Sequence, residues 1–469
     1  MTQMISTRDS EKIARTYTDA LLAGLAPDGG LYVPAEYPAF SRDELTALKD
    51  SPYTRIAYEV KKKLVGGSIP DDTLQTMIEE AYSLANFAIE NNQVVPAHNI
   101  GENLWLQNLS LGPTAAFKDM AMQLLGREMA YELNRRGETL AILGATSGDT
   151  GSAAEAAFKG LERITLTMLS PLEGMSDFQR AQMGSFSGGN IRNVSVRGRF
   201  DDCQDLVKSV KQDPEFARLG AVNSINWARI SSQIPYYFSG YLQVVRNIGE
   251  EVDFAVPSGN FGNVLSGYIA KKMGLPIRRL IVATNENSVL HRLFTTGVYE
   301  NTPATITSSP SMDISKASNY ERLIFDVLDG DAAETARYMR AFNETGRVDI
   351  ADFGRTVHAF RERGFESGAS THANRLQTIR EVYESSKVVI DPHTADGVYV
   401  GKKQLTDAPM VCLATALPVK FEHTIREALG FIPPRPARFV DLEKQIQPDA
   451  FHVIDVDAEQ LKGILRSHM

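Results

Sequence analysis

Short apolar stretches alternate with segments of helical periodicity from about residue 96 onward. The apolar stretches predict buried strands, and the periodic segments between them predict helices. We expect strands at 104–106, 139–143, 164–169, 191–196, 254–256, 280–284, 388–390 and 410–414, and helices at 201–210, 264–273 and from residue 152. Strands that alternate with helices favour an α/β fold of parallel sheets with helices on both faces.

The first 95 residues have a different pattern. Helical periodicity surrounds a turn-rich loop that holds one short extended piece, and we expect these helices at 13–25, 42–49 and 74–84, the loop at 26–38 and the extended piece at 31–33. A polar run before Pro96 marks a boundary. Residues 1–95 are therefore predicted to form a small helical domain that covers a larger one.

Lys118 lies between a predicted turn and a predicted helix. Gly112 and Pro113 are residues typical of turns, and helical spacing of apolar residues begins at Met120. A lysine at such a junction can direct its amine into a cleft. Taken alone, Lys118 would be read as an ordinary exposed lysine, because most lysines are exposed.

Two Gly-rich loops follow predicted strands, and ligands bind at the carboxyl ends of strands in open α/β sheets. The loop PSGNFGN (257–263) can bring backbone amides and a helix N-terminus to a phosphate. The loop GATSGDTG (144–151) offers hydroxyls and amides to a carboxylate or a second phosphate. Singly, the first would also suit a tight turn and the second a helix N-cap.

Two further positions add polar groups. Thr415 ends a predicted strand, where a buried, backbone-bonded threonine is the ordinary alternative. Asn226, Arg229 and Gln233 share one helix face, which otherwise suits a solvated surface. Arginine binds phosphate or carboxylate through two parallel hydrogen bonds. A lysine, a phosphate cup, a second anion loop, a hydroxyl and an arginine together suit pyridoxal phosphate, whose aldehyde needs an amine.

Composition narrows the classes of partner. The net charge of −9 and the lack of a basic cluster argue against nucleic-acid binding. Two distant cysteines and eight scattered histidines indicate neither a disulfide framework nor a metal site. The polar N-terminus and the lack of an apolar run of ~18 residues favour a cytoplasmic protein with no membrane partner. We expect a monomer or a weak homo-oligomer.

Eight motifs spread over nearly the whole chain are shared with one family: STRD (6–9), GLAPDGGLYVP (24–34), GPTAAFKD (112–119), ATSGDTG (145–151), NSINWARI (223–230), PSGNFGN (257–263), MDISKASNYERL (312–323) and DPHTADGV (391–398). With them the chain resembles the threonine synthase family, in the tryptophan-synthase-β-like class of fold-type II pyridoxal-phosphate enzymes. Its order and N-terminal extension are similar to the longer, bacterial and fungal branch. The chain departs from the family at two positions. Family members often carry a polar residue at the position of Leu111, and commonly leucine at the position of Ala115.

The resemblance implies two parallel-sheet α/β domains with the cofactor in the cleft between them. Residues 96–130 and 250–469 would form the larger domain, and residues 131–249 the smaller. Lys118 would be catalytic and would carry pyridoxal 5′-phosphate through a Schiff base. The implied cofactor-binding residues are Lys118, Asp149, Gly259, Asn260, Phe261, Gly262, Asn263 and Thr415. The implied substrate-binding residues are Thr146, Ser147, Thr150, Asn226, Arg229, Lys316, Asn319 and Arg322.

The implied reaction converts the small molecule O-phospho-L-homoserine and water into L-threonine and phosphate, the last step of threonine biosynthesis. The alternatives are a phospho-lyase or a serine/threonine dehydratase of the same fold, and a non-catalytic homologue that binds the cofactor. Arg229 favours a phosphorylated substrate, and an intact Lys118 argues against the non-catalytic homologue. A nucleotide-binding oxidoreductase lacks support, because the chain has no dinucleotide fingerprint.

Overall fold

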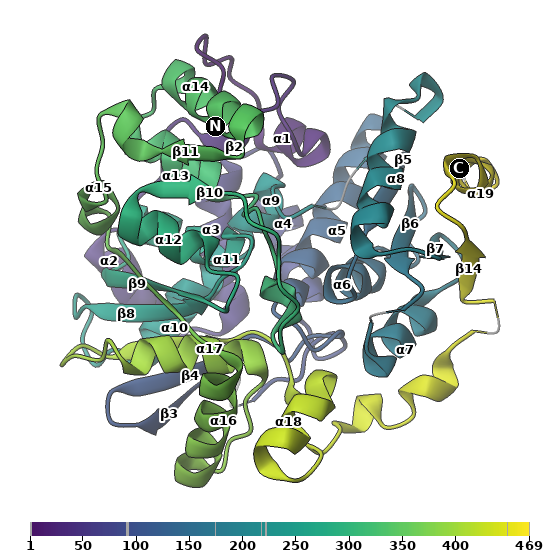
Figure 1. The fold of residues 1–469 in the computed structure, drawn as a ribbon. Helices are drawn as coiled ribbons and strands as arrows, with labels where there is room; N and C mark the ends of the chain where they lie inside the picture. Colours follow the sequence, from purple (N-terminus) through teal and green to yellow (C-terminus); the bar gives the residue numbers. More distant parts are fainter. Residues whose placement is uncertain are drawn as a thin grey trace.

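The computed structural model describes residues 2–90, 93–173, 175–216, 218–220, 223–447 and 449–468. Two lobes lie side by side, each built around a parallel sheet (Figure 1). Within the described residues, no helix is both long and apolar enough to cross a membrane. The α/β architecture with two parallel sheets, predicted from the sequence, is confirmed.

The larger lobe contains, within the described residues, a six-stranded sheet in the order β12-β9-β8-β13-β4-β3. All neighbouring strands are parallel except the edge pair β3 and β4. The strands are β3 (Ala97–Gly101), β4 (Leu104–Asn108), β8 (Val252–Pro257), β9 (Ile277–Thr284), β12 (Phe365–Ala369) and β13 (Met410–Ala414). Every residue of the central strands β8 and β13 is buried, as expected for a parallel sheet covered on both faces.

The smaller lobe contains, in the described part of the chain, a four-stranded parallel sheet in the order β14-β7-β6-β5. Its strands are β5 (Leu140–Ala145), β6 (Ile164–Pro171), β7 (Ile191–Val196) and β14 (Phe451–Ile454). The domain boundaries stay a prediction, but β14 pairs in the smaller sheet although its segment was assigned to the larger domain. The C-terminal segment therefore crosses from one lobe to the other (Figure 1).

The N-terminal region is helical, with one small hairpin. Its elements are β1 (Met4–Ser6), α1 (Tyr17–Ala23), β2 (Tyr32–Pro34), α2 (Arg42–Leu48), α3 (Tyr53–Val65) and α4 (Asp71–Ala81). Helix α1 is shorter than the helix predicted at 13–25. Thr16 caps it by accepting the Asp19 amide, and the Asp19 carboxylate accepts the Thr16 amide in return.

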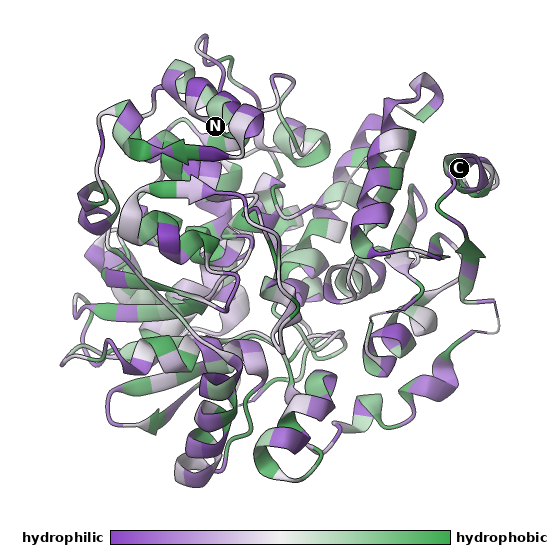
Figure 2. Ribbon diagram, in the orientation of Figure 1, coloured by the Kyte–Doolittle hydropathy of each residue, from purple (hydrophilic) through white to green (hydrophobic). Residues whose placement is uncertain are grey.

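The remaining helices surround the two sheets, and polar residues gather on outer helices such as α8 and α16 (Figure 2). They are α5 (Lys118–Arg136), α6 (Asp149–Phe158), α7 (Asp177–Phe186), α8 (Phe200–Gln212), α9 (Trp227–Ser231), α10 (Ile234–Val244), α11 (Gly262–Lys272), α12 (Val289–Thr296), α13 (Tyr320–Val327), α14 (Ala332–Thr345), α15 (His358–Glu362), α16 (His372–Ser386), α17 (Pro392–Lys402), α18 (Glu422–Leu429) and α19 (Ala458–Arg466). A second hairpin joins β10 (Val298–Glu300) and β11 (Arg347–Asp349).

The strand predicted at 388–390 was wrong. These residues connect α16 to α17, and no strand pairs with them in the described chain. Lys387 ends α16 in a left-handed conformation, and Asp391 caps α17 by accepting the His393 amide. The apolar residues between these two caps form a connection that packs into the core of the larger lobe. A short apolar run looks the same in sequence whether it forms a buried strand or a buried connection, so the pattern alone could not separate the two.

A buried ion pair joins the N-terminal region to the rest of the protein. Lys61 on α3 lies 2.9 Å from Glu128 on α5, and both side chains are 0% exposed. The Lys61 ammonium also donates to the hydroxyls of Tyr17 at 2.7 Å and Ser231 at 2.9 Å. Because α5 begins at Lys118, the network links the N-terminal region directly to the helix that carries this lysine.

We predict that Lys61→Met lowers the free energy of unfolding by about 3–5 kcal/mol, because it leaves Glu128 buried without its cation. The double variant Lys61→Met/Glu128→Leu should lose less than the sum of the two single losses, which urea unfolding would measure. The exposed pair Lys402–Glu381 is the control, and Lys402→Met should cost less than about 1 kcal/mol. Additive losses at Lys61 and Glu128 would contradict the coupling.

Candidate active site

A pocket lies at the carboxyl ends of β4, β5, β8 and β13, and residues from both lobes line it. This is the place where polar loops after parallel strands were expected to meet. The predicted site residues that line the pocket are Lys118, Asp149, Thr150, Arg229, Gly259, Asn260, Phe261, Gly262, Asn263 and Thr415.

Lys118 is the first residue of α5, and its side chain is 13% exposed. Its Nζ lies 3.3 Å from Asp149 Oδ2. Burial is the largest influence on this amine and lowers its pKa; the Asp149 carboxylate opposes that effect, and the cations of Lys420 and Arg229 reinforce it. An amine with a lowered pKa can act as a nucleophile and as a base near neutral pH.

Asp149 begins α6, and its buried carboxylate is shared by four partners. Oδ1 lies 2.6 Å from Lys420 Nζ and accepts from Gln179 Nε2 at 2.9 Å. Oδ2 faces Lys118 and accepts from Ser311 Oγ at 3.0 Å. Burial acts to raise the pKa of Asp149, but the two lysines outweigh it and hold the pKa well below its ordinary value. Asp149 is therefore an anion.

The loop between β8 and α11 forms another wall. Phe261 adopts φ = 65°, in the left-handed region, where the chain turns into α11. Asn263 Oδ1 accepts from the hydroxyls of Tyr236 at 2.6 Å and Tyr237 at 2.8 Å, which orients the amide group. Asn263 Nδ2 and Ser258 Oγ are buried without a hydrogen-bond partner among the described residues. These two groups and the start of α11 suit a phosphate.

Arg229 presents a second set of donors. It lies on α9, is 5% exposed, and its Nε and Nη1 have no hydrogen-bond partner in the described chain. Burial lowers its pKa to about 10, which leaves the guanidinium charged at neutral pH. A buried charge without a counter-ion is costly, so the position suits an anionic ligand.

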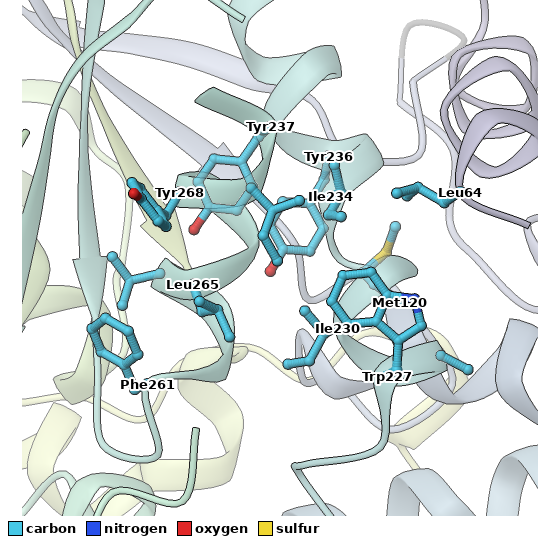
Figure 3. Close-up of a cluster of buried hydrophobic side chains, with 14 of the residues drawn as sticks. Leu64, Met120, Trp227, Ile230, Ile234, Tyr236, Tyr237, Phe261, Leu265 and Tyr268 are labelled. Carbon is cyan, nitrogen blue, oxygen red and sulfur yellow. The ribbon is translucent and has the colours of Figure 1, made fainter. Parts of the chain in front are cut away.

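An apolar cluster fixes the helices that carry these groups. Trp227 and Ile230 of α9, Leu265 of α11 and Met120 of α5 belong to one buried cluster (Figure 3). The cluster sets α9 and α11 against the helix that begins at Lys118. Interiors are close-packed, so the lysine and both sets of donors are held at fixed separations.

Ser311 and His393 complete the wall on the larger lobe. The Ser311 amide donates to His393 Nε2 at 3.0 Å, and His393 Nδ1 lies 2.9 Å from Asp391 Oδ1. Because Nε2 accepts, the ring proton sits on Nδ1 and points to Asp391. This arrangement fixes Ser311, whose hydroxyl reaches Asp149.

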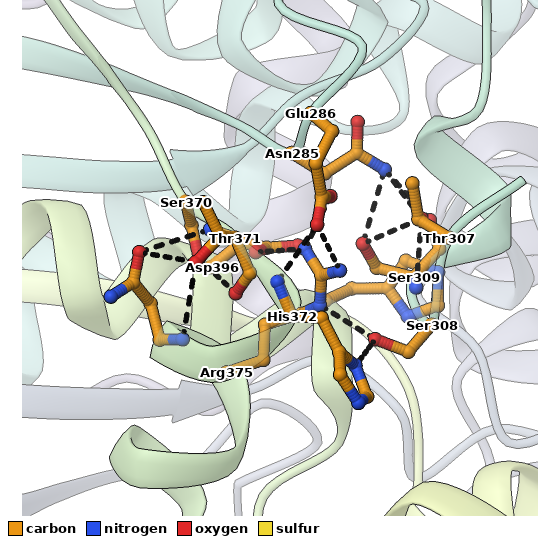
Figure 4. A network of polar contacts seen from close by, with 12 residues as sticks. Asn285, Glu286, Thr307, Ser308, Ser309, Ser370, Thr371, His372, Arg375 and Asp396 are labelled. Carbon is orange, nitrogen blue, oxygen red and sulfur yellow. Dashed lines mark hydrogen bonds and ion pairs between the residues drawn. The ribbon is translucent and has the colours of Figure 1, made fainter. Parts of the chain in front are cut away.

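A polar network supports the segment that carries Ser311. Arg375 pairs with Glu286 at 2.9 Å and with Asp396 at 3.1 Å, and it donates to Ser308 Oγ at 2.7 Å (Figure 4). Asn285 Nδ2 donates to Ser309 Oγ at 3.1 Å in the same network. The segment before Ser311 is thus tied to α16 and α17 of the larger lobe.

The other predicted substrate residues lie outside the set that lines the pocket: Thr146, Ser147, Asn226, Lys316, Asn319 and Arg322. Three of them shape the pocket from behind. Asn226 caps α9 by accepting the Ala228 amide at 2.9 Å. Asn319 Nδ2 donates to the Asn260 carbonyl at 3.2 Å, and Arg322 donates to Asn319 Oδ1 at 2.6 Å.

The remaining three take other places. Thr146 Oγ1 accepts the amides of Gly148 at 3.0 Å and Gly151 at 2.8 Å, which shapes the turn into α6. Ser147 is exposed. Lys316 Nζ lies 3.2 Å from Asn343 Oδ1.

Sequence reasoning missed several residues of the site region, among them Gln179, which donates to Asp149, and Ser311, His393 and Lys420. His393 belongs to the motif DPHTADGV, and Ser311 directly precedes MDISKASNYERL, so both could have been proposed from their motifs. Lys420 carries no such signal. It follows Thr415 by a few residues, and nothing local distinguishes a buried lysine from an exposed one.

Three family models match the chain in succession. The threonine synthase N terminus matches residues 3–82, the pyridoxal-phosphate dependent enzyme model matches residues 86–359, and the threonine synthase C-terminal model matches residues 394–465. A threonine synthase from Methylobacillus glycogenes is 47% identical over 99% of both chains. One from Corynebacterium glutamicum is 48% identical over 93% of this chain and 92% of its own.

The chain belongs to the threonine synthase family. A solved structure of this family has the same fold: the pyridoxal-phosphate-bound threonine synthase from Brucella melitensis superposes with a TM-score of 0.94 at 40% identity. The match covers 100% of this chain and 99% of that one. The resemblance stated from the motifs is confirmed.

The pocket residues fit the cofactor of the threonine synthase family. Lys118 supplies an amine with a lowered pKa. Ser258 and Asn263, whose donors have no partner among the described residues, flank the turn that leads from β8 into α11. A Cβ atom on Gly259 would lie 3.0 Å from Met312 Cα, so glycine lets the 311–312 segment approach this loop. The amine can bind an aldehyde, and the neutral donors with the helix N-terminus can bind a phosphate.

We predict that Arg229→Met raises the free energy of unfolding of the protein, measured without cofactor or phosphate, by about 1 kcal/mol or more, because it removes a buried charge that lacks a partner in the described part of the chain. The matched control is Arg322→Met. Arg322 is as deeply buried, at 3% exposed, but donates to Tyr32 O at 2.9 Å, Asn319 Oδ1 at 2.6 Å and Ile225 O at 2.6 Å. That variant should lose stability. A loss in both variants would mean that Arg229 has protein partners.

Proposed function

We propose that this chain converts O-phospho-L-homoserine and water into L-threonine and phosphate, with pyridoxal 5′-phosphate bound covalently to Lys118. One observation carries the proposal: two separate sets of donors, without partners in the ranges that the structure describes, share a pocket with a lysine amine. Ser258 and Asn263 suit the phosphate of the cofactor, and Arg229 suits a second phosphate. Serine and threonine carry no phosphate, so a dehydratase would leave Arg229 without its anion.

The chain's own groups have defined tasks in this reaction. Bound pyridoxal phosphate supplies an electron-withdrawing ring that stabilises negative charge on the substrate carbon bearing the amino group. The Lys118 amine, released when the substrate binds, removes the protons at Cα and then Cβ, and phosphate leaves Cγ. A proton is then added at Cγ, water adds its hydroxyl at Cβ, and a proton returns to Cα as threonine forms. Its lowered pKa suits a base that must gain and lose protons near neutral pH. Arg229 binds the phosphate and stabilises its charge as it leaves Cγ.

Other residues are assigned to binding and support. We assign the cofactor phosphate to the loop 259–263 with Ser258, and the pyridine nitrogen to Thr415. In the loop 144–151, Thr150 lines the pocket near the start of α6 and is the best-placed group for the substrate carboxylate. The residues behind the pocket hold its walls and leave the anion contacts to Arg229. A cytoplasmic location and a monomeric or weakly oligomeric state stay predictions from the sequence.

The direct test is an assay with purified protein, pyridoxal phosphate and O-phospho-L-homoserine. We expect equal amounts of phosphate and threonine. Phosphate with 2-oxobutyrate in place of threonine would identify a phospho-lyase, and no phosphate release would indicate a non-catalytic homologue.

Two variants separate the roles within that assay. Lys118→Ala should abolish covalent cofactor attachment and product formation. Arg229→Met should keep the cofactor absorbance yet lose roughly two orders of magnitude in activity, since a charge-assisted hydrogen bond contributes about 1.5–3 kcal/mol and each ~1.4 kcal/mol is tenfold. If Arg229→Met lost cofactor binding, Arg229 would belong to the cofactor's phosphate site.

A further inference from the structure

Lys420 is a fully buried lysine beside the pocket. It lies in the short 3₁₀ helix η4 (Pro418–Phe421), which follows β13, and its side chain is 0% exposed. Its Nζ lies 2.6 Å from Asp149 Oδ1 and donates to the Thr114 carbonyl at 2.9 Å. A buried ammonium is stable only when it is paired and hydrogen-bonded, and these two contacts meet that need. The contact to Asp149 also joins the larger lobe to the first turn of α6.

Lys420 and Lys118 use different oxygens of the same carboxylate. Lys420 lies 2.6 Å from Oδ1, whereas Lys118 lies 3.3 Å from Oδ2. The Lys420 side chain is 0% exposed, and that of Lys118 is 13% exposed and lines the pocket. Coulomb attraction strengthens as distance and local dielectric fall, so Lys420 forms the stronger pair with Asp149.

Positive charge exceeds negative charge around this carboxylate. The charged and titratable groups around Lys118, Asp149 and Lys420 are these three together with Asp119 on α5, Arg229 on α9 and His393 on α17. Burial raises the pKa of Asp119 to about 6, which weakens it as a counter-ion. Lys420 and Lys118 thus share one firm anion, and Lys118 has the longer contact, while Arg229 adds positive charge near Lys118.

We propose that Lys420 is a positioning residue for Lys118: its ammonium stays paired with Asp149 and thereby prevents that carboxylate from holding Lys118 in the protonated form. The inference rests on the proposed function, because it takes Lys118 as the reacting amine. It explains how an anion can lie beside Lys118, orienting it, without fixing a proton on it. Lys420 is not among the described residues that line the pocket of Lys118, so we place its action on Lys118 through Asp149.

The test is a pH titration of the visible absorbance of the cofactor bound to Lys118, in the wild type and in Lys420→Met. Methionine keeps the length of the side chain and removes its charge. Asp149 is then left with Lys118 as its remaining lysine partner, and the pocket loses one cation. Both effects favour protonation of the Lys118 nitrogen, so the pKa read from the absorbance should rise by about one unit or more.

Two controls separate charge from shape. Lys420→Arg keeps a cation, and its pKa should stay close to the wild-type value. Lys402→Met removes an exposed lysine that pairs with Glu381, and it should leave the pKa unchanged. A Lys420→Met protein that melts like the wild type with an unchanged or lowered pKa would overturn the proposal, as would equal shifts in Lys420→Met and Lys420→Arg.

A second comparison holds if Lys420→Met alone fails to fold. The double variant Lys420→Met/Asp149→Asn removes both charges of the pair. Proteins often tolerate the loss of a whole buried ion pair better than the loss of one partner, which leaves the other charge buried alone. Without the carboxylate Lys420 has nothing to act through, so the pKa of the double variant should lie close to that of Asp149→Asn alone. A rise of about one unit or more over Asp149→Asn would overturn the proposal, because Lys420 would then act on Lys118 directly and not through Asp149. If the wild type showed no absorbance from a Lys118-bound cofactor, the proposed function itself would fail.

Discussion

The Asp149 carboxylate receives contacts from four parts of the chain that lie far apart in sequence: Lys118, Gln179, Ser311 and Lys420. These groups come from α5, α7, the segment before α13 and the segment after β13. A buried anion must be neutralised and hydrogen-bonded, so all four elements have to meet at one point. The meeting point fixes the Lys118 amine at the edge where the two sheets present their loops.

The same demand for charge balance recurs through the molecule. Lys61 and Glu128 compensate each other inside the contact between the N-terminal region and α5. Arg322 is satisfied by backbone carbonyls and Asn319, whereas Arg229, at similar burial, has two nitrogens without partners among the described residues. The contrast between these two arginines distinguishes a structural cation from one that suits a ligand, although both stand in motifs typical of the family.

The α/β fold and the walls of the pocket could be predicted from the sequence, because strand, loop and helix signals are local. The loop 258–263 and Lys118 each follow a strand, and parallel sheets bring such positions together. Lys420 could not be predicted, since its partner lies 271 residues away and is chosen by the order of strands and the closeness of the lobes. Lys316 has the same chemistry as a phosphate ligand, yet packing directs it to Asn343. The connection at 388–390 shows the same limit, because an apolar run becomes a strand only where a partner edge is available.

Two lysines lie beside one carboxylate, and the proposed function depends on which of them binds the cofactor. Borohydride reduction of the holoenzyme makes the lysine–cofactor bond permanent, and peptide mass spectrometry then locates it. We expect the reduced adduct on the peptide that contains Lys118, with Lys420 unmodified. An adduct on Lys420, or on a lysine outside the pocket, would contradict the assignment of Lys118.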